Sequence, residues 1–290
     1  MWKKSSLPFL RGTRPLVMAH RGDSAQFPEN SLQAYQEAYD LNVDVIETDL
    51  RMTKDKQIIF FHDAKVDRTT NGKGFVKNYT LHELKKMDQG YWFSVVENEQ
   101  EIYPFRGKGL KIQSLEEILN RFPDMRFNMD IKDRDSLVPQ VLAKKLKQLN
   151  AEQRVMIGSF HQRQLQRFRK HSSAPTSAGP LEVWRFRKKI NKTLKKHPTI
   201  INDQNEDLQQ KIFHHKLPFF ALQIPLKVAF LNLIKTPSFI QLSQLCGIAI
   251  HIWTINNLND MQRLLEWGVD GIFTDKPKIL INLLEQINVY

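Results

Sequence analysis

Apolar stretches of strand length alternate with amphipathic stretches along most of this 290-residue chain. In the amphipathic stretches apolar residues recur every three or four positions, which is typical of helices. Several of them follow a Ser or Asn that is suited to capping a helix. The pattern predicts strands at 16–20, 43–52, 57–62, 125–132, 154–160, 219–225, 249–256 and 270–275, with a weaker one near 176–184. It predicts helices at 31–41, 114–122, 136–149, 161–171, 258–268 and 276–287.

Repeated strand–helix units predict an α/β fold with a parallel sheet and crossover helices. About eight units fit, which is the number in a (β/α)8 barrel. Residues 63–111 interrupt the alternation of strands and helices and contain a short helical pattern of their own, so they are interpreted as an insertion. No stretch resembles a linker, and the chain is expected to form a single domain over 1–290.

Composition narrows the class of protein. An apolar share of 41% is enough for a sizeable core, and a single cysteine, Cys246, excludes an internal disulfide framework. We therefore expect a reducing, cytoplasmic location. The first residues contain no apolar run long enough for a signal peptide, and no run of about 18 apolar residues predicts a spanning helix. The formal net charge of +12 favours an anionic partner, either phosphate groups or an acidic membrane surface.

Acidic residues lie near the ends of two predicted strands. Glu47 and Asp49 alternate within "VIETDLR", so their side chains share one face of the strand, with backbones roughly 6.5–7 Å apart. Asp130 and Lys132 share a face of "FNMDIKD" for the same reason. Two acids inside a barrel need a cation to neutralise them. Each pair has a plainer interpretation as an exposed strand face.

Two histidines close apolar strands. His20 follows "LVMA", and His62 follows "QIIFF". A histidine at the end of a strand is most often a surface residue. If all the strands are parallel, however, both histidines lie with the acids at the carboxyl end of the barrel, where barrel active sites are found.

The residues together resemble the glycerophosphodiester phosphodiesterase family. The matching motifs are "AHRG", "PENS", "ETDL", "FFHD", "DRTTNGKG", "TLHELKKMDQGYWF", "SLEEIL", "FNMDIK", "WTIN" and "GVDGIFTDKP", in this order over about residues 16 to 280. The family is similar to a (β/α)8 barrel with a small insertion after the second strand, and the segment 63–111 suits that insertion.

The resemblance implies a reaction and a site. The enzyme would cleave a glycerophosphodiester into an alcohol and glycerol phosphate, with a divalent cation, Ca²⁺ or Mg²⁺, held by oxygen ligands. The implied roles are metal ligation by Glu47, Asp49 and Asp130, base and acid catalysis by His20 and His62, phosphate binding by Arg21 and Lys132, and a wall of the substrate pocket for Trp253.

One position departs from the family pattern. The third carboxylate of the family is usually a glutamate in Glu-Ile-Lys, whereas here the sequence is Asp130-Ile131-Lys132. An aspartate at this place also resembles the sphingomyelinase D branch of related barrels. The shorter side chain is expected to change which metal is preferred and the distance between the carboxylate and that metal.

Three functions compete at this stage. The first is a metal-dependent phosphodiesterase. The second is a metal-free barrel lipase of the phosphatidylinositol phospholipase C type, which also uses two histidines but generally lacks the three acids. The third is a non-catalytic binder of lipid or nucleic acid. No nucleic-acid-binding motif is visible, and nucleic acid is not expected as a partner.

The segment 181–240 is the part least similar to the family. Residues 185–196 contain seven basic residues, and 225–239 are unusually apolar. The plain interpretation is a solvated helix followed by core elements. The alternative is a lip on the active-site rim that contacts an anionic membrane peripherally, which would favour lysophospholipids as substrates.

Overall fold

The protein is described by a computed structural model covering residues 7–12, 15–202, 207–228, 231–234 and 236–287. Seven parallel strands pair side by side in the order β7-β6-β2-β1-β12-β11-β8. They are β1 (Leu16–His20), β2 (Val45–Met52), β6 (Arg126–Ile131), β7 (Val155–Gly158), β8 (Ala221–Pro225), β11 (Ala249–Trp253) and β12 (Gly271–Thr274).

A short eighth segment lies between the two outermost strands. Thr176 bridges Ile157 of β7 and Ser177 bridges Ala221 of β8, both in parallel. The strand predicted over 176–184 is therefore wrong beyond its first residues. Pro180 occupies the first turn of helix α6, where its missing N–H costs nothing, and the chain leaves the sheet there. With this segment the sheet forms the expected (β/α)8 barrel.

The segment predicted as a strand at 57–62 forms β3 (Ile58–Phe60), which pairs with β2 in antiparallel register. A parallel orientation was the wrong expectation for this segment. Parallel neighbours need a crossover of a dozen or more residues, whereas only residues 53–57 separate these two strands. A tight turn joins them, in which Lys56 adopts a positive φ of 62°.

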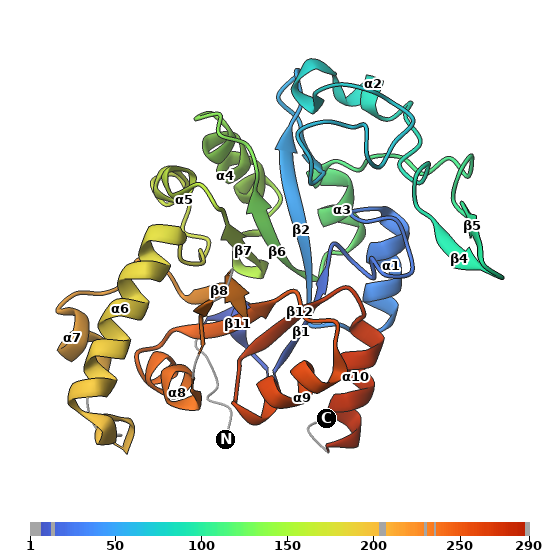
Figure 1. Cartoon of the computed structure of the whole chain (residues 1–290). Coiled ribbons are helices and arrows are strands. Elements are labelled where there is room, and N and C mark those ends of the chain that lie inside the picture. The colour runs from blue at the N-terminus through green and yellow to red at the C-terminus, as the bar shows by residue number, and fades with distance from the viewer. Residues whose placement is uncertain (1–6, 13–14, 203–206, 229–230, 235, 288–290) are drawn as a thin grey trace.

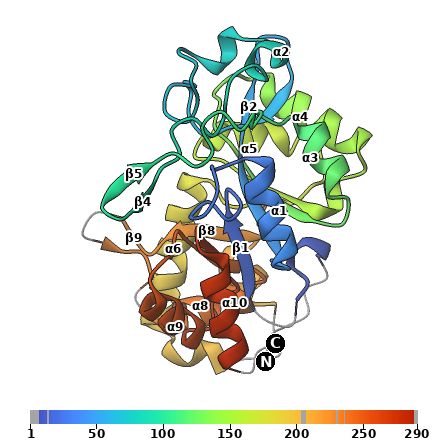
Figure 2. The same ribbon diagram turned by 90° about the vertical axis from the view of Figure 1, so that its right-hand side faces the viewer.

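The insertion follows this hairpin. It contains the 3-10 turn η2 (Val76–Asn78), the short helix α2 (Leu81–Leu84) and a second hairpin of β4 (Val95–Glu97) and β5 (Gln100–Ile102). The part that carries α2 lies beyond the carboxyl end of β2, and the β4–β5 hairpin projects away from the barrel (Figures 1 and 2). A small apolar cluster of its own joins it to β3, made of Ile59, Phe61, Val66, Val76, Leu84 and Ile112.

Helices surround the strands (Figure 1). They are α1 (Leu32–Asp40), α3 (Leu115–Arg121), α4 (Val138–Gln148), α5 (Gln162–Phe168), α6 (Pro180–Lys196), α7 (Leu208–Phe213), α8 (Pro237–Leu245), α9 (Leu258–Glu266) and α10 (Pro277–Gln286). Shorter elements are η1 (Pro8–Leu10), η3 (Glu152–Arg154), η4 (Pro198–Asn202), β9 (Lys227–Val228) and β10 (Leu231–Asn232). The predicted caps are confirmed at Ser31, Ser114 and Asn257, whose side chains accept hydrogen bonds from the first helical turns.

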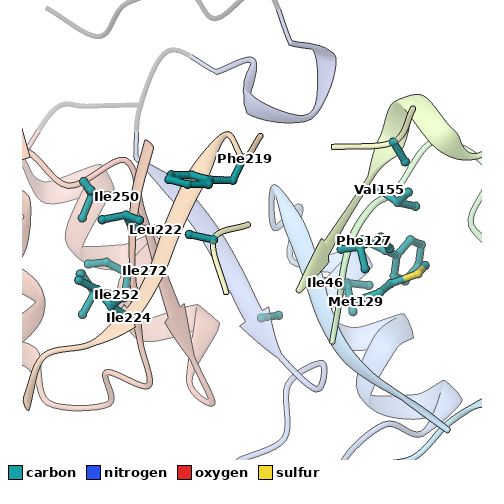
Figure 3. Close-up of a cluster of buried hydrophobic side chains, with 14 of the residues drawn as sticks. Ile46, Phe127, Met129, Val155, Phe219, Leu222, Ile224, Ile250, Ile252 and Ile272 are labelled. Atoms are coloured by element: carbon teal, nitrogen blue, oxygen red, sulfur yellow. The ribbon is translucent and has the colours of Figure 1, made fainter. Parts of the chain in front are cut away.

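Buried side chains of the strands form the core against the helices. Figure 3 shows them in two groups: Ile46, Phe127, Met129 and Val155 on β2, β6 and β7, and Leu222, Ile224, Ile250, Ile252 and Ile272 on β8, β11 and β12. This packing fixes the strands, and with them the direction of every side chain at their carboxyl ends. Among the described residues, no helix is long and apolar enough to cross a bilayer.

Candidate active site at the carboxyl ends of the strands

The turn after β1 sets the first two polar side chains of the site. His20 ends the strand, and the backbone N–H of Arg21 donates to the Glu47 carbonyl oxygen at 2.9 Å. Gly22 then lies against helix α1 at a φ of +85°, where a Cβ atom would meet the backbone carbon of Ala34 at 2.6 Å. Only glycine fits this approach, so the sequence His-Arg-Gly holds both side chains at the carboxyl end of β1.

Three carboxylates meet on β2 and β6. Glu47 and Asp49 alternate along β2, and Asp49 is in register with Asp130 on the neighbouring parallel strand. All three side chains are buried, while Ile46 and Leu50 on the opposite face of β2 pack in the core. The structure thus brings together the three acids that the sequence selected.

Cations hold two of these acids. The Lys132 Nζ lies 2.9 Å from Asp49 Oδ1 and 2.5 Å from Asp130 Oδ2, and Arg21 Nε lies 3.1 Å from Asp49 Oδ2. Burial alone would raise the pKa of Asp49, but the charges of Lys132 and Arg21 outweigh it and lower this pKa to about 2. Asn30 adds a hydrogen bond of 3.0 Å to Asp49 Oδ2.

For Glu47 and Asp130 the nearby cations do not outweigh the effect of burial. Burial raises the pKa of Glu47 to about 7, and the negative charge of Asp49 adds to the effect. Burial also raises the pKa of Asp130, although Lys132 opposes it. The centre of the site therefore has more buried negative charge than its two cations neutralise.

A divalent cation fits the chemistry of this donor set. Carboxylate oxygens are the ligands that Ca²⁺ and Mg²⁺ prefer, and among the described residues no Lys or Arg side chain pairs with the buried carboxylate of Glu47. In the described ranges, however, no three His, Cys, Asp or Glu side chains are arranged to hold a metal. Lys132 contacts two of the three acids instead, and Glu47 Oε2 lies 3.9 Å from His20 Nε2.

His20 is fixed from the far end of the chain. Its Nδ1 lies 2.6 Å from Asp275 Oδ1, directly after β12, and Asp275 also accepts hydrogen bonds from Ser24 and Asn256. Burial lowers the pKa of His20, but Glu47 and Asp275 together outweigh it and leave this pKa raised. Asp275 was missed as a site residue, although it carries the same signal as His20: a polar residue that closes an apolar strand.

His62 reaches the site from the hairpin rather than from a parallel strand. The carbonyl oxygen of Asp49 accepts a hydrogen bond of 2.9 Å from the backbone N–H of Phe61, which places His62 beside the acids. The His62 Nδ1 lies 2.6 Å from Asp63 Oδ1. The location predicted for His62 is therefore confirmed, while its structural basis differs.

A chain of ion pairs connects Arg21 with His62 through residues of the insertion and of the loop after β1. Arg68 Nε donates to Asp63 at 2.6 Å, and its two Nη atoms donate to Glu29 at 2.6 and 2.8 Å. Glu29 in turn accepts from Arg21 Nη1 at 3.0 Å. Glu29 and Arg68 lie within the motifs "PENS" and "DRTTNGKG", but they were given no role because neither lies on a strand. They link the orientation of His62 to that of Arg21.

Trp253 ends β11 at the same side of the barrel. Its ring meets the ring of Phe160 edge to face, with centroids 5.7 Å apart, and Phe160 is largely exposed. Phe160 also lines a cavity of about 610 Å³, together with His62 and Lys132. The site is thus open to solvent, and aromatic side chains form one of its walls.

The proposed lip lies only partly on the rim, where β9 follows the carboxyl end of β8. Helix α6 begins next to the eighth strand segment and runs down the flank of the barrel (Figure 1). Arg185 and Lys189 border Leu217–Phe219, which precede β8 at its amino end. In 225–239 the side chains of Ile234 and Phe239 are buried in the core. Phe230 lies outside the described residues.

A parallel barrel with two histidines, three buried carboxylates and two cations at the strand ends defines a barrel hydrolase suited to phosphate esters. Residues 20–279 match the model of the glycerophosphoryl diester phosphodiesterase family. The chain therefore belongs to this family of phosphoric diester hydrolases.

Individual relatives agree with the family match. The chain is 33% identical over 285 residues to a glycerophosphodiester phosphodiesterase from Caldanaerobacter subterraneus, covering 94% of this chain and 99% of that protein. It is 32% identical over 277 residues to one from Bacillus subtilis, covering 92% and 85%. The fold is similar to a glycerophosphoryl diester phosphodiesterase domain from Mycobacterium tuberculosis, at TM-score 0.73, 17% identity and coverage of 94% and 99%.

A second solved structure is a phosphodiesterase from Oleispira antarctica in complex with the product sn-glycerol-3-phosphate. It is similar at TM-score 0.65 and 22% identity, with coverage of 94% of this chain and 97% of that one.

Proposed function

We propose that this phosphodiesterase hydrolyses glycerophosphodiesters to an alcohol and glycerol phosphate, by histidine acid–base catalysis beside a carboxylate-bound divalent cation. One observation supports it most: His20 Nε2 lies 3.9 Å from a buried carboxylate of a three-acid cluster, while its Nδ1 is held by Asp275. This is the arrangement of a positioned proton carrier next to a charged centre.

Arg21 and Lys132 are the proposed phosphate ligands. Both are largely buried, and both are held by Asp49, so their charges are fixed before substrate binds. A phosphodiester carries one negative charge. A planar guanidinium and an ammonium would bind its non-bridging oxygens, the first as a fork and the second as a point charge.

His20 and His62 divide the proton transfers in this proposal. His20 accepts a proton from the attacking water, and the Asp275 carboxylate keeps its Nδ1 protonated so that Nε2 is free to accept. His62 donates a proton to the oxygen of the departing alcohol, with Asp63 in the equivalent supporting position. Each transfer would contribute about 10²- to 10⁴-fold to the rate.

Glu47, Asp49 and Asp130 would hold the divalent cation. When bound, such an ion polarises a phosphate oxygen and neutralises charge at phosphorus. The shorter side chain of Asp130, where the family usually has glutamate, forms an ion pair of 2.5 Å with Lys132. Calcium tolerates variable oxygen geometry better than magnesium, so we expect Ca²⁺ to support activity at least as well as Mg²⁺.

A lysophospholipase D-type activity at a membrane surface is the second candidate. The exposed face of α6 favours it, because Trp184 and Leu181 are exposed there at the end nearest the barrel mouth. Six exposed basic residues follow along the helix: Arg185, Lys188, Lys189, Lys192, Lys195 and Lys196. The one acid of α6, Glu182, is paired with Arg169. A basic helix with an aromatic end is suited to an anionic interface.

The test is a product assay on the purified protein with glycerophosphodiesters and lysophospholipids, with and without a chelator. The proposal expects glycerol phosphate from the diesters and loss of turnover in excess chelator, restored by Ca²⁺ or Mg²⁺. Full activity in chelator would favour the metal-free lipase mechanism. No turnover of any substrate would favour a lipid-binding protein without catalysis.

A further inference from the structure

The cavity beside His62 lies between the insertion and two loops of the barrel. Its volume is about 610 Å³. The insertion contributes one wall, and the loops after β6 and β7 contribute the other. Its lining includes His62, Lys65, Phe75, Lys132, Phe160 and His161.

Two exposed aromatic rings in this cavity resemble the beginnings of an aromatic cage. Such cages bind quaternary ammonium groups through the faces of their rings. Here the faces already have ammonium groups over them. Lys65 Nζ and Lys77 Nζ lie 5.1 and 5.8 Å from the Phe75 ring centroid, and Lys132 Nζ lies 5.6 Å from that of Phe160. A choline group entering the cavity would meet like charges at Phe75, whereas the charge of Lys132 over Phe160 is shared with Asp49 and Asp130.

The charged residues that line the cavity also disfavour a cationic group. Asp63 is the only carboxylate among the described residues that line the cavity, and it is already bonded to His62 and Arg68. Lys65 and Lys77 are exposed and form no ion pair with any residue in the described ranges. The cavity therefore presents net positive charge to whatever group occupies it.

We propose that this cavity receives the departing alcohol and selects alcohols without a cationic group, so that neutral polyols and phosphorylated alcohols are preferred over choline and ethanolamine. The inference rests on the proposed function, in which water forms a new bond to phosphorus as the bond to the alcohol oxygen breaks. His62 borders the cavity and gives its proton to that oxygen. The alcohol portion beyond the oxygen then lies against Lys65, Phe75 and Phe160.

The experiment compares kcat/KM for a series of glycerophosphodiesters that share glycerol phosphate and differ in the alcohol: choline, ethanolamine, glycerol, inositol and glycerol phosphate. We expect the neutral and anionic alcohols to exceed choline by about tenfold or more at low salt, since a few close like charges are worth about that factor. The preference should shrink at high salt, because the lysines are exposed.

Two variants test the origin of the preference. Lys65→Glu combined with Lys77→Glu should shift the choline-to-glycerol ratio of kcat/KM by at least about tenfold toward choline. Lys65→Met with Lys77→Met, which keeps side-chain bulk beside Phe75, should give a smaller shift in the same direction. Lys144→Glu with Lys147→Glu is the matched control, because both lysines are exposed on α4 and do not line the cavity. The control should leave the ratio unchanged.

The outcomes separate this inference from the proposed function. Turnover of the whole series with choline as the best alcohol, or a ratio that neither pair of variants changes, would overturn the inference and leave the phosphodiesterase in place. No turnover of any member would overturn the proposed function itself.

Discussion

The carboxylate of Asp275 and the imidazole of His20 lie 2.6 Å apart, although they are 255 residues apart in the chain. They meet because β1 and β12 are parallel neighbours, with Ala19 opposite Thr274, so that the residues after both strands lie side by side. The bond fixes which ring nitrogen of His20 faces Glu47. In the proposed mechanism Asp275 is thus a positioning residue, which acts on the reacting atoms through His20.

Asp275→Asn should lower kcat by about 10- to 100-fold and change KM by less than threefold, because it disturbs the tautomer of His20 and leaves the phosphate ligands in place. Steady-state kinetics and a thermal melt of the same sample measure both effects. Asp260→Asn is the matched control, since the side chain of Asp260 is 38% exposed and pairs with Arg263 within α9. Equal losses in kcat/KM and in folded fraction would assign Asp275 a merely structural role.

Glu47→Gln should weaken binding of Ca²⁺ or Mg²⁺ and abolish turnover at low metal concentration, because a hard cation loses a charged oxygen ligand. High metal should restore part of the activity. Calorimetric titration of the metal gives the dissociation constant directly, and Asp124→Asn, on an exposed loop, serves as the control. An unchanged dissociation constant in Glu47→Gln would remove this residue from the proposed ligand set.

Local patterns in the sequence predicted most of the fold. The alternation of strand and helix gave seven of the parallel strands and the barrel architecture, and the N-cap residues gave the starts of three helices. Two elements could not be read in this way. The eighth strand segment forms only two bridges, at Thr176 and Ser177, so tertiary packing rather than its sequence defines it. The direction of β3 depends on the short turn before it, which a search for apolar runs ignores.

The candidate site was predictable where it lies on strands. Glu47 and Asp49 share a face because side chains alternate along β2, and Asp130 joins them through the register of β6. The supporting residues were not predictable, since Glu29, Asp63 and Arg68 lie in loops and meet only through ion pairs across the fold. The basic stretch 185–196 was placed on the rim because it follows a strand, whereas a 17-residue helix takes most of it down the flank.

A buried histidine makes the free energy of unfolding depend on pH. His251 lies on β11 with no exposed surface, and burial lowers its pKa to about 3. Below the ordinary pKa of 6.5 the unfolded chain binds a proton that the folded chain does not. This contribution to stability is therefore complete above pH 6.5 and is lost as pH falls toward 3.

His251→Gln should remove that dependence. Between pH 8 and pH 5 the wild type should lose about 2 kcal/mol of unfolding free energy through this residue, and the variant should not. Burial raises the pKa of Asp270 to about 6, which acts in the opposite sense, but it is present in both proteins and cancels in their difference. Urea unfolding at the two pH values measures the difference, with the exposed His171→Gln as control. Parallel pH profiles would show that His251 takes up its proton in the folded state.

The exposed face of α6 gives a separate prediction about membranes. Lys188→Glu with Lys189→Glu should weaken binding to anionic vesicles by at least about fivefold per lysine, and salt should weaken wild-type binding. Trp184→Ser should reduce turnover of vesicle-bound lysophospholipid and leave small glycerophosphodiesters nearly unaffected. Vesicle sedimentation and the two assays measure this, with Lys144→Glu and Lys147→Glu on α4 as the matched charge control. A wild type that ignores anionic vesicles would exclude this surface as a lipid contact.

In the proposed mechanism two histidines beside one carboxylate cluster move the protons of phosphodiester hydrolysis. The most direct measurement is kcat of His20→Ala and His62→Ala with glycerophosphoglycerol at saturating Ca²⁺, beside a thermal melt of each variant. Both side chains border open space, since they are 20% and 33% exposed, so each variant should remain folded. We expect each variant to lose about 10²- to 10⁴-fold in kcat. A folded variant that keeps more than half of wild-type turnover would contradict the role given to that histidine.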